Sequence, residues 1–151
     1  MMEVSDNFLA EQILILASST LSDTLSSSRA RKYMLANELK DIKQQPRWVD
    51  GSGLSRYNLF SPMSFVTVLT KLYRTISQER LFHLFASTNK KDSYLFAKTG
   101  SFGNNYNVSG YLRTNSGNVL VFSFMNNHFK KTNAEIKQQM QATFEWLRDH
   151  Y

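Results

Sequence analysis

Hydrophobic residues recur every three or four positions in the first part of the chain, which is the spacing of an amphipathic helix. One stripe predicts a helix over residues 6–25, and a second predicts a helix over residues 28–43 that ends before Pro46. The first stripe consists of Phe8, Leu9, Ile13, Leu16 and Ala17. The second consists of Ala30, Met34, Leu35, Leu39 and Ile42. Each helix therefore has one apolar side.

A segment rich in glycine and serine, WVDGSGLSRYNLFSP at residues 48–62, interrupts this spacing and is predicted to be an irregular loop. Ser61 and Pro62 have the pattern of a helix N-cap followed by proline at the first helical position. The helix that they open carries the apolar stripe Phe65, Val66, Leu69, Leu72 and Tyr73. A short further helix is predicted around residues 79–85.

From residue 93 the hydrophobic spacing changes to the period of two that is typical of a β-strand. Residues 94–99 and 106–113 alternate in this way, and residues 119–125 are apolar on both faces, as in a buried strand. The short connections predict an antiparallel meander. Four aromatic residues are predicted to lie in the core: Trp48, Phe65, Phe122 and Phe124.

The last predicted element is a helix that begins with a capping box formed by Thr132 and Glu135. Its inward-facing residues are Ile136, Met140, Phe144 and Leu147. Helices, then three antiparallel strands, then a closing helix predict the α/β class with segregated elements, in which an antiparallel sheet is packed with helices.

The composition narrows the classes of function. A chain of 151 residues that is 42% hydrophobic can bury the core of one domain. The net charge of +6 comes from scattered lysines and arginines, which favours a solvated surface over a nucleic-acid site. The absence of cysteine excludes disulfides, thiolate metal sites and a cysteine nucleophile. The three histidines, His83, His128 and His150, are too far apart for metal-ligand spacing. No signal peptide is visible.

Two short motifs suggest chemistry. Lys98, Thr99 and Gly100 end an apolar strand, where an ammonium and a hydroxyl can face a cleft while the glycine leaves room for a ligand backbone. The N–H group of Ser101 could then face a developing oxyanion. At the other motif, Ser5-Asp6-Asn7, a hydroxyl and a carboxamide project from the start of the first helix.

Ser-x-Asn followed by Lys-Thr-Gly on a strand gives two of the three signatures of active-site serine penicillin-binding proteins and class A β-lactamases. The stretches SDNFLAEQIL, WVDGSGLSRYNLFSP and FAKTGSFGNNYNVSGYL resemble the penicillin-binding D-alanyl-D-alanine carboxypeptidases of the low-molecular-mass class C type, a family that also has endopeptidase activity. The resemblance covers nearly the whole chain. It implies part of a β-lactamase/transpeptidase-like domain and a reaction through an acyl-enzyme.

The resemblance also implies roles for individual residues, as follows. Ser5 relays a proton to the leaving amine, Asn7 binds a substrate amide, Lys98 lowers the barrier electrostatically, Thr99 binds the terminal carboxylate, Gly100 leaves room and Ser101 completes the oxyanion hole. Structural alternatives remain: Ser5 and Asn7 as helix caps, and Lys98 as a solvated strand-end lysine. Four loop residues either shape the cleft wall or hold the loop together: Asp50, Ser52, Ser55 and Arg56.

The remaining signature, Ser-x-x-Lys, is missing. Its spacing recurs only at Ser87–Lys90, between the other two motifs, whereas the pair of the family precedes both, and a solvated turn is therefore favoured over a nucleophile. We therefore expect residues 1–151 to be the C-terminal part of the domain, with the nucleophile and the export signal in an upstream part. The resemblance implies no cofactor and no metal, a periplasmic or cell-envelope location, and peptidoglycan stem peptides and β-lactams as ligands. An exposed sheet edge could permit self-association. The alternative function is a non-catalytic module that binds stem peptides or β-lactams.

Overall fold

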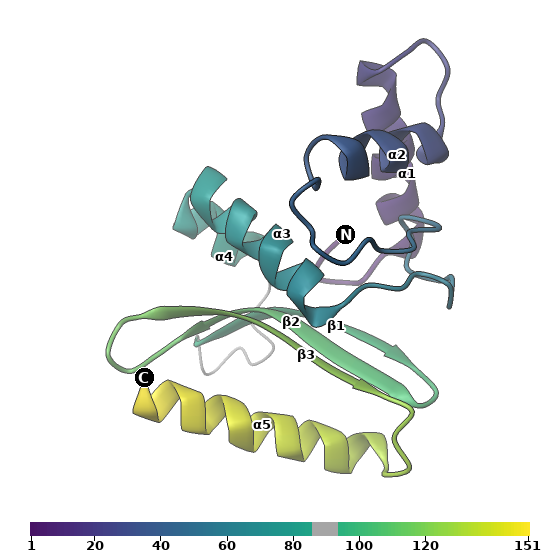
Figure 1. Ribbon diagram of the computed structural model, residues 1–151. Helices are drawn as coiled ribbons and strands as arrows, with labels where there is room; N and C mark the ends of the chain where they lie inside the picture. Colours follow the sequence, from purple (N-terminus) through teal and green to yellow (C-terminus); the bar gives the residue numbers. More distant parts are fainter. Residues whose placement is uncertain (86–93) are drawn as a thin grey trace. The chain divides into compact units, whose positions relative to one another are not determined.

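A computed structural model describes residues 1–85 and 94–151, which belong to two compact units. Unit 1 comprises Met1–Thr67 and unit 2 comprises Val68–Tyr151. Figure 1 labels the elements along the chain, and the boundary between the units falls within helix α3 (Pro62–Thr75).

Unit 1 contains helix α1 (Asn7–Ala17), the short 3-10 helix η1 (Ser18–Thr20), helix α2 (Ser27–Ala36) and the first residues of α3. The buried hydroxyl of Ser18 donates to the carbonyl of Ile15 (2.6 Å) and accepts from the backbone N–H of Ser26 (2.7 Å). This serine therefore joins the end of α1 to the start of α2. The predicted loop over residues 48–62 is irregular apart from an isolated bridge between Arg47 and Leu59 and the first residue of α3, Pro62.

Both predicted N-terminal helices are too long. After Ala17, three consecutive hydroxyls, those of Ser18, Ser19 and Thr20, each donate to the carbonyl three residues earlier. Side-chain hydroxyls therefore compete with backbone N–H groups for these carbonyls, and the α-helix is followed by the 3-10 helix η1. Helix α2 ends at Ala36, and its C-cap is Asn37, whose side-chain amide donates to the carbonyl of Tyr33 beside the last helical backbone bond.

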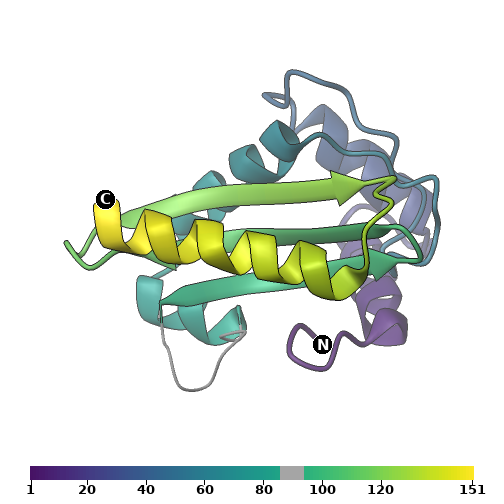
Figure 2. The same ribbon diagram turned by 90° about the horizontal axis from the view of Figure 1, so that it is seen from below.

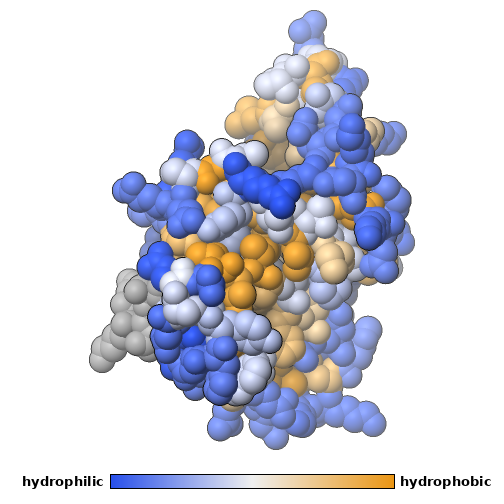
Figure 3. All heavy atoms as spheres, turned by 60° about the vertical axis from the view of Figure 1, so that its left-hand side comes forward, coloured by the Kyte–Doolittle hydropathy of each residue, from blue (hydrophilic) through white to orange (hydrophobic). Residues whose placement is uncertain are grey.

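The apolar stripe of α1 is not covered by other residues in the part of the chain that the structure describes. No residue of α1 is buried, and the side chains of Phe8, Ile13 and Leu16 are 70%, 53% and 58% exposed. Figure 3 shows hydrophobic residues at the surface in its upper part, where α1 and α2 lie. The prediction that Phe65 is a core residue is also wrong, because its ring contacts Phe60 yet remains 38% exposed. Among the described helices, none is both long and apolar enough to cross a membrane.

Unit 2 is built on a three-stranded antiparallel sheet with the order β1-β2-β3. The strands are β1 (Leu95–Phe102), β2 (Asn105–Arg113) and β3 (Val119–Asn127). Helix α5 (Asn133–His150) runs along one face, whereas α4 (Gln78–Leu84) and the part of α3 from Val68 lie on the other (Figures 1 and 2). The predicted meander and the segregated α/β class are confirmed.

Apolar side chains fill both faces of this sheet. Toward α5 the core consists of Leu95, Ala97, Val108, Leu112, Ile136, Met140 and Phe144, with Phe122 and Phe124 partly buried against it. On the opposite face Tyr111 is fully buried, and its hydroxyl donates to the carbonyl of Leu69 (2.8 Å). The ring of Tyr111 contacts the rings of Phe82 and Phe85. The predicted capping box at Thr132 is present and begins α5.

Gly110 allows β1 and β2 to approach closely. A Cβ atom at this position would lie 2.2 Å from the carbonyl oxygen of Phe96 and 2.6 Å from the Cα atom of Ala97. Both neighbouring atoms belong to the backbone and cannot rotate away. Glycine is therefore required at residue 110 by the packing of the sheet.

Candidate active-site elements

The first candidate element is the N-terminal tip of α1. Asp6 is the N-cap, and its carboxylate accepts from the backbone N–H of Leu9 (2.8 Å). Ser5 has a φ of +55°, a left-handed conformation that is uncommon for a residue with a side chain. Ser5 and Asn7 are both exposed on either side of this cap. The alternative in which Ser5 or Asn7 caps the helix is therefore wrong, and a strained serine stands in front of the helix, as is typical of functional positions.

The loop that contains Asp50 is held by the side chains within it. The carboxylate of Asp50 accepts from the backbone N–H groups of Gly53 (2.8 Å) and Ser55 (3.0 Å) and from the side-chain amide of Asn58 (3.1 Å). Burial acts to raise the pKa of Asp50, but these hydrogen bonds stabilise the carboxylate and leave its pKa below the ordinary value. Asp50 thus holds the loop together, which was one of the two predicted roles.

Further hydroxyls in this loop make similar local bonds. The hydroxyl of Ser52 accepts from the N–H of Leu54 (3.2 Å), and that of Ser55 accepts from the N–H of Tyr57 (3.2 Å). The side chain of Arg56 is exposed. These serines therefore act in the loop as local hydrogen-bond acceptors.

Glu11 ties this loop to α1, a role that the sequence did not reveal. Its carboxylate accepts from the N–H groups of Gly51 (2.6 Å) and Ser52 (3.1 Å). Gly51 lies so close to the helix that a Cβ atom would stand 3.0 Å from the Cβ atom of Leu14. Because Glu11 and Gly51 are 40 positions apart along the chain, no local sequence pattern predicts this contact.

The second candidate element is the end of β1. Thr99, Gly100 and Ser101 are exposed, and Lys98 is partly exposed. The ammonium of Lys98 donates to the carbonyl of Thr99 (2.8 Å), and burial lowers the pKa of this lysine. Among the described strands β1 pairs with β2 alone, so these residues lie on an edge strand of the sheet.

Gly100 differs from Gly110 in the space around the place that a Cβ atom would occupy. No atom lies within 4 Å of the place where a Cβ atom of Gly100 would stand. The packing of the described residues therefore does not require glycine here. A requirement for glycine at residue 100 would have to come from a group outside the described residues, such as a ligand or another part of the protein.

The register of the sheet places further polar groups beside Lys98. Lys98 is opposite Ser109, which is opposite Ser123, so the three side chains share the face away from α5. The hydroxyls of Ser109 and Ser123 are 2.8 Å apart and hydrogen-bonded. Asn107 belongs to the same row of alternate residues, and its side-chain oxygen is buried without a hydrogen-bond partner among the described residues. The sequence alone did not single out Asn107, Ser109 or Ser123.

The two candidate elements belong to different units. The structure places Ser5 and Asn7 together at one helix tip, and Lys98 to Ser101 together at one strand end. The predicted solvated turn at Ser87–Lys90 lies outside the described residues.

Several solved structures share the fold. The chain superposes on penicillin-binding protein 4 from Haemophilus influenzae with a TM-score of 0.81 and 24% identity, covering 99% of this chain and 38% of that one. It superposes on the penicillin G-acylated predatory endopeptidase Bd3459 from Bdellovibrio bacteriovorus, solved with an immunity protein, with a TM-score of 0.72 and 18% identity. That match covers 97% of this chain and 44% of the endopeptidase. The chain thus spans about two fifths of the length of the proteins it matches.

Comparison of the sequence with curated proteins found no match. The family model of the D-Ala-D-Ala carboxypeptidase 3 (S13) family matches residues 1–149, which is nearly the whole chain. Its coverage includes both candidate elements, at the tip of α1 and at the end of β1. The chain therefore belongs to the D-Ala-D-Ala carboxypeptidase 3 (S13) family.

Proposed function

We propose that this chain is the C-terminal part, residues 1–151, of a serine-type peptidase that cleaves the terminal D-Ala–D-Ala bond of peptidoglycan stem peptides. The observation that carries the proposal is the family match over residues 1–149 together with an exposed Lys-Thr-Gly motif on an edge strand. An edge strand offers free backbone groups along which an extended peptide can bind. The neighbours of similar fold include a penicillin-binding protein and an endopeptidase acylated by penicillin G.

In this proposal the C-terminal dipeptide of the stem lies along β1. Thr99 donates a hydrogen bond to the terminal carboxylate, Gly100 leaves space for the peptide backbone, and the N–H of Ser101 stabilises the oxyanion. Open space around Gly100 supports this arrangement, because a methyl group there would meet none of the described residues and would intrude into the space proposed for the peptide.

The remaining residues would move the proton and orient the substrate. An upstream serine attacks the carbonyl carbon of the penultimate D-alanine, an ester bond forms and the C–N bond breaks. Ser5 passes the proton of that serine to the leaving amine, while Lys98 stabilises the developing negative charge. The side-chain amide of Asn7 forms a hydrogen bond with an amide group of the stem peptide. Water then hydrolyses the ester and frees the serine. This mechanism requires the hydroxyl of Ser5 and the ammonium of Lys98 to meet at one cleft.

The upstream part with Ser-x-x-Lys is the first proposed partner. Two features of this chain favour such a partner: the exposed apolar residues of α1, and strand β3, which among the described strands pairs with β2 alone. Isolated from that part, the chain would self-associate through the same surfaces. Because the proposed substrate is peptidoglycan, the complete protein would act in the cell envelope, in the periplasm where there is an outer membrane.

Labelling with a fluorescent penicillin tests this function. We expect no covalent label on residues 1–151 alone, and a stable label on the protein extended upstream to include Ser-x-x-Lys. In the extended protein, Lys98→Ala should slow acylation by about 100-fold. Lys130→Ala, which removes an exposed lysine of the same unit outside the proposed site, should not change the rate.

Other outcomes would redirect the proposal. Acylation that is equally fast in the Lys98→Ala variant contradicts the role of Lys98. Absence of label on both proteins, with saturable binding of a stem peptide, supports the non-catalytic binding module instead. Release of D-alanine from a pentapeptide, compared with cleavage of a cross-linked dimer, distinguishes carboxypeptidase from endopeptidase activity.

A further inference from the structure

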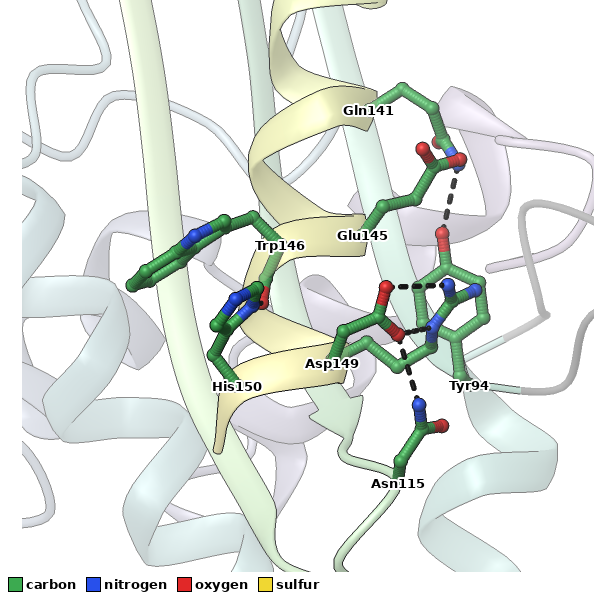
Figure 4. A network of polar contacts seen from close by, with 8 residues as sticks. Tyr94, Asn115, Gln141, Glu145, Trp146, Asp149 and His150 are labelled. Atoms are coloured by element: carbon green, nitrogen blue, oxygen red, sulfur yellow. Dashed lines mark hydrogen bonds and ion pairs between the residues drawn. The ribbon is translucent and has the colours of Figure 1, made fainter.

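One buried polar atom of unit 2 lacks a hydrogen bond of the kind that such atoms normally make. Among the described residues it is the side-chain oxygen of Asn107, in β2. A network at the end of α5, drawn in Figure 4, shows the usual situation. There Gln141 donates to the hydroxyl of Tyr94 (2.8 Å), and Asn115 donates to Asp149 (2.9 Å). Because a desolvated oxygen without a donor is unfavourable, we expect a donor to reach Asn107 in the working protein.

Asn107 lies beside the Lys-Thr-Gly motif. It is opposite Gly100 across β1 and β2, and Lys98 is opposite Ser109, two residues further along β2. Because alternate residues of a strand share a face, the side chains of Asn107 and Lys98 both lie on the face away from α5. Diagonal neighbours on two strands are within reach of a long side chain, and the space at Gly100 is open among the described residues. The ammonium of Lys98 can therefore reach the oxygen of Asn107.

In the structure the ammonium of Lys98 donates to a different acceptor, the backbone carbonyl of Thr99 (2.8 Å). The register of the sheet shows which way this carbonyl points. The backbone N–H of Arg113 donates to the carbonyl of Tyr94 (2.7 Å), and such hydrogen-bonded pairs alternate along an antiparallel ladder with pairs whose backbone groups point outward. Thr99 is five positions from Tyr94, so its carbonyl points to the edge of β1 that no described strand covers. Lys98 thus occupies an acceptor that a peptide bound along this edge would use.

We propose that Asn107 is a positioning residue for the reaction: when a peptide binds to the Thr99 carbonyl, the ammonium of Lys98 transfers its hydrogen bond to the side-chain oxygen of Asn107. This inference rests on the proposed function, because it assumes that a peptide binds along β1. The transfer exchanges one oxygen acceptor for another, so that the ammonium keeps its hydrogen bond and Asn107 gains one. It also makes the position of the ammonium depend on the presence of substrate.

Acylation of the upstream-extended protein by a fluorescent penicillin tests this role. Asn107→Leu removes the acceptor at similar volume, and should lower the acylation rate constant by about tenfold while the half-saturating concentration changes by less than about twofold. Asn107→Asp keeps an oxygen at the same place and should retain the wild-type rate to within about threefold. Met125→Leu, opposite Asn107 in β3, alters the packing beside it without removing an acceptor and should leave the rate unchanged.

A double-mutant cycle separates positioning from a merely structural role. If Asn107 acts through Lys98, Asn107→Leu should have little further effect on acylation in a Lys98→Ala background. Asn107→Val also lacks the acceptor and suits a β-strand, so it provides the same test if the leucine variant does not fold. Three results overturn the inference and leave the peptidase proposal standing: a wild-type rate in Asn107→Leu, an equal loss in both backgrounds, or an Asn107→Asp variant as slow as Asn107→Leu.

Nuclear magnetic resonance of residues 1–151 makes a second test independent of catalysis. The ammonium signal of Lys98, assigned by its loss in Lys98→Ala, should shift on titration with an N-acetylated stem peptide that ends in D-Ala-D-Ala. The shift should be much smaller in Asn107→Leu. This pair of results, in a protein whose extended form never reacts with penicillin, supports the role of Asn107 and contradicts the peptidase. A signal that shifts equally in both proteins, or in neither, overturns the inference.

Discussion

The two units are stabilised in different ways. In unit 2 helices cover both faces of the sheet, and the side chains of Leu81, Tyr111 and Leu112 are completely inaccessible to solvent. In unit 1 helix α1 has no buried residue, and the buried residues are small or few: the serines Ser18 and Ser64 and the apolar residues Ala30, Leu39 and Ile42. Unit 2 is thus held by apolar packing, whereas the loop of unit 1 is held by directed hydrogen bonds.

This difference indicates which unit would gain more from a covering partner. Apolar burial contributes about 25 cal/mol per Å² and accumulates over a whole core, whereas a hydrogen bond has a net contribution of about 1 kcal/mol. Hydrogen bonds can fix the conformation of a loop but leave the apolar side of α1 in contact with water. We therefore expect unit 2 to be the more stable unit of the isolated chain, and unit 1 to gain more from a covering surface.

Removal of a core ring should give the largest effect. Phe144 is 3% exposed and packs against Phe122 with 4.8 Å between ring centroids. Phe144→Ala should lower the free energy of unfolding of unit 2 by about 4 kcal/mol. Ile13→Ala, at a 53% exposed position of α1, should change stability by less than about 0.5 kcal/mol. Urea titrations followed by amide exchange in each unit measure both, and equal losses would contradict the comparison.

A matched pair of glycines tests how tightly the sheet packs. Gly110→Ala places a methyl group against the backbone of Phe96 and Ala97, and should cost about 3 kcal/mol. Gly100→Ala, in the neighbouring strand, meets no atom within 4 Å and should leave the thermal midpoint nearly unchanged. If both variants lose stability alike, the open space at Gly100 is filled in solution, and its proposed role toward a ligand fails.

The hydrogen bonds of unit 1 can be broken at Glu11. Glu11→Ala leaves the N–H groups of Gly51 and Ser52 without their acceptor, at a cost of about 2 kcal/mol. Amide hydrogen exchange at Gly51 and Ser52 should become about 30-fold faster, and this rate is the measurement. Glu3→Ala removes an exposed carboxylate at the same end of the chain and serves as the control. Unchanged exchange at both amides would show that the loop is held by Asp50 alone.

The smallest effect concerns pH. Burial raises the pKa of Tyr111 to about 12 from an ordinary value of 10. Between these values the unfolded chain has lost the phenolic proton while the folded chain retains it, so the stability from this group is present below pH 10 and is lost as the pH rises toward 12. Tyr111→Phe should cost about 1 kcal/mol at neutral pH, because the bond to Leu69 is lost. It should also remove a slope of up to about 1.4 kcal/mol per pH unit.

A comparison of alkaline unfolding curves measures that slope. Burial lowers the pKa of Lys98, and this acts in the opposite direction over the alkaline range, so the difference between the wild type and Tyr111→Phe isolates the tyrosine. Parallel curves for the two proteins would show that the phenol is solvated in the folded state.

Much of unit 2 could be predicted from the sequence. Period-two alternation identified β1 and β2, a continuous apolar run identified β3, and the capping box identified the start of α5 at Thr132. These signals are local, because strand pleat and helix caps depend on residues a few positions apart. The ends of α1 and α2 were missed, since the hydroxyls of Ser18 to Thr20 and the amide of Asn37 compete with helical hydrogen bonds in a way that hydrophobic spacing does not record.

The candidate site was predicted in part. The two motifs lie where their order along the chain predicted, at the tip of α1 and at the end of β1, and their roles in a site stay a prediction. Glu11, Asn107 and the hydroxyl pair of Ser109 and Ser123 were missed, because they acquire their places only through loop packing and strand register. That Asp6 is the helix cap, leaving Ser5 and Asn7 exposed, also required coordinates.

The sequence alone determined the kinds of element, their order, the two motifs and the family to which they belong. The tertiary structure decided which apolar stripes are covered, which glycine is required by packing and which carboxylate holds the loop at residue 50. The reason is that hydrogen bonding and periodicity act between neighbours in the chain, whereas burial is decided by surfaces that distant segments bring together. In this protein, contacts between distant segments bury the apolar residues of the sheet, whereas no described segment covers the apolar stripe of α1.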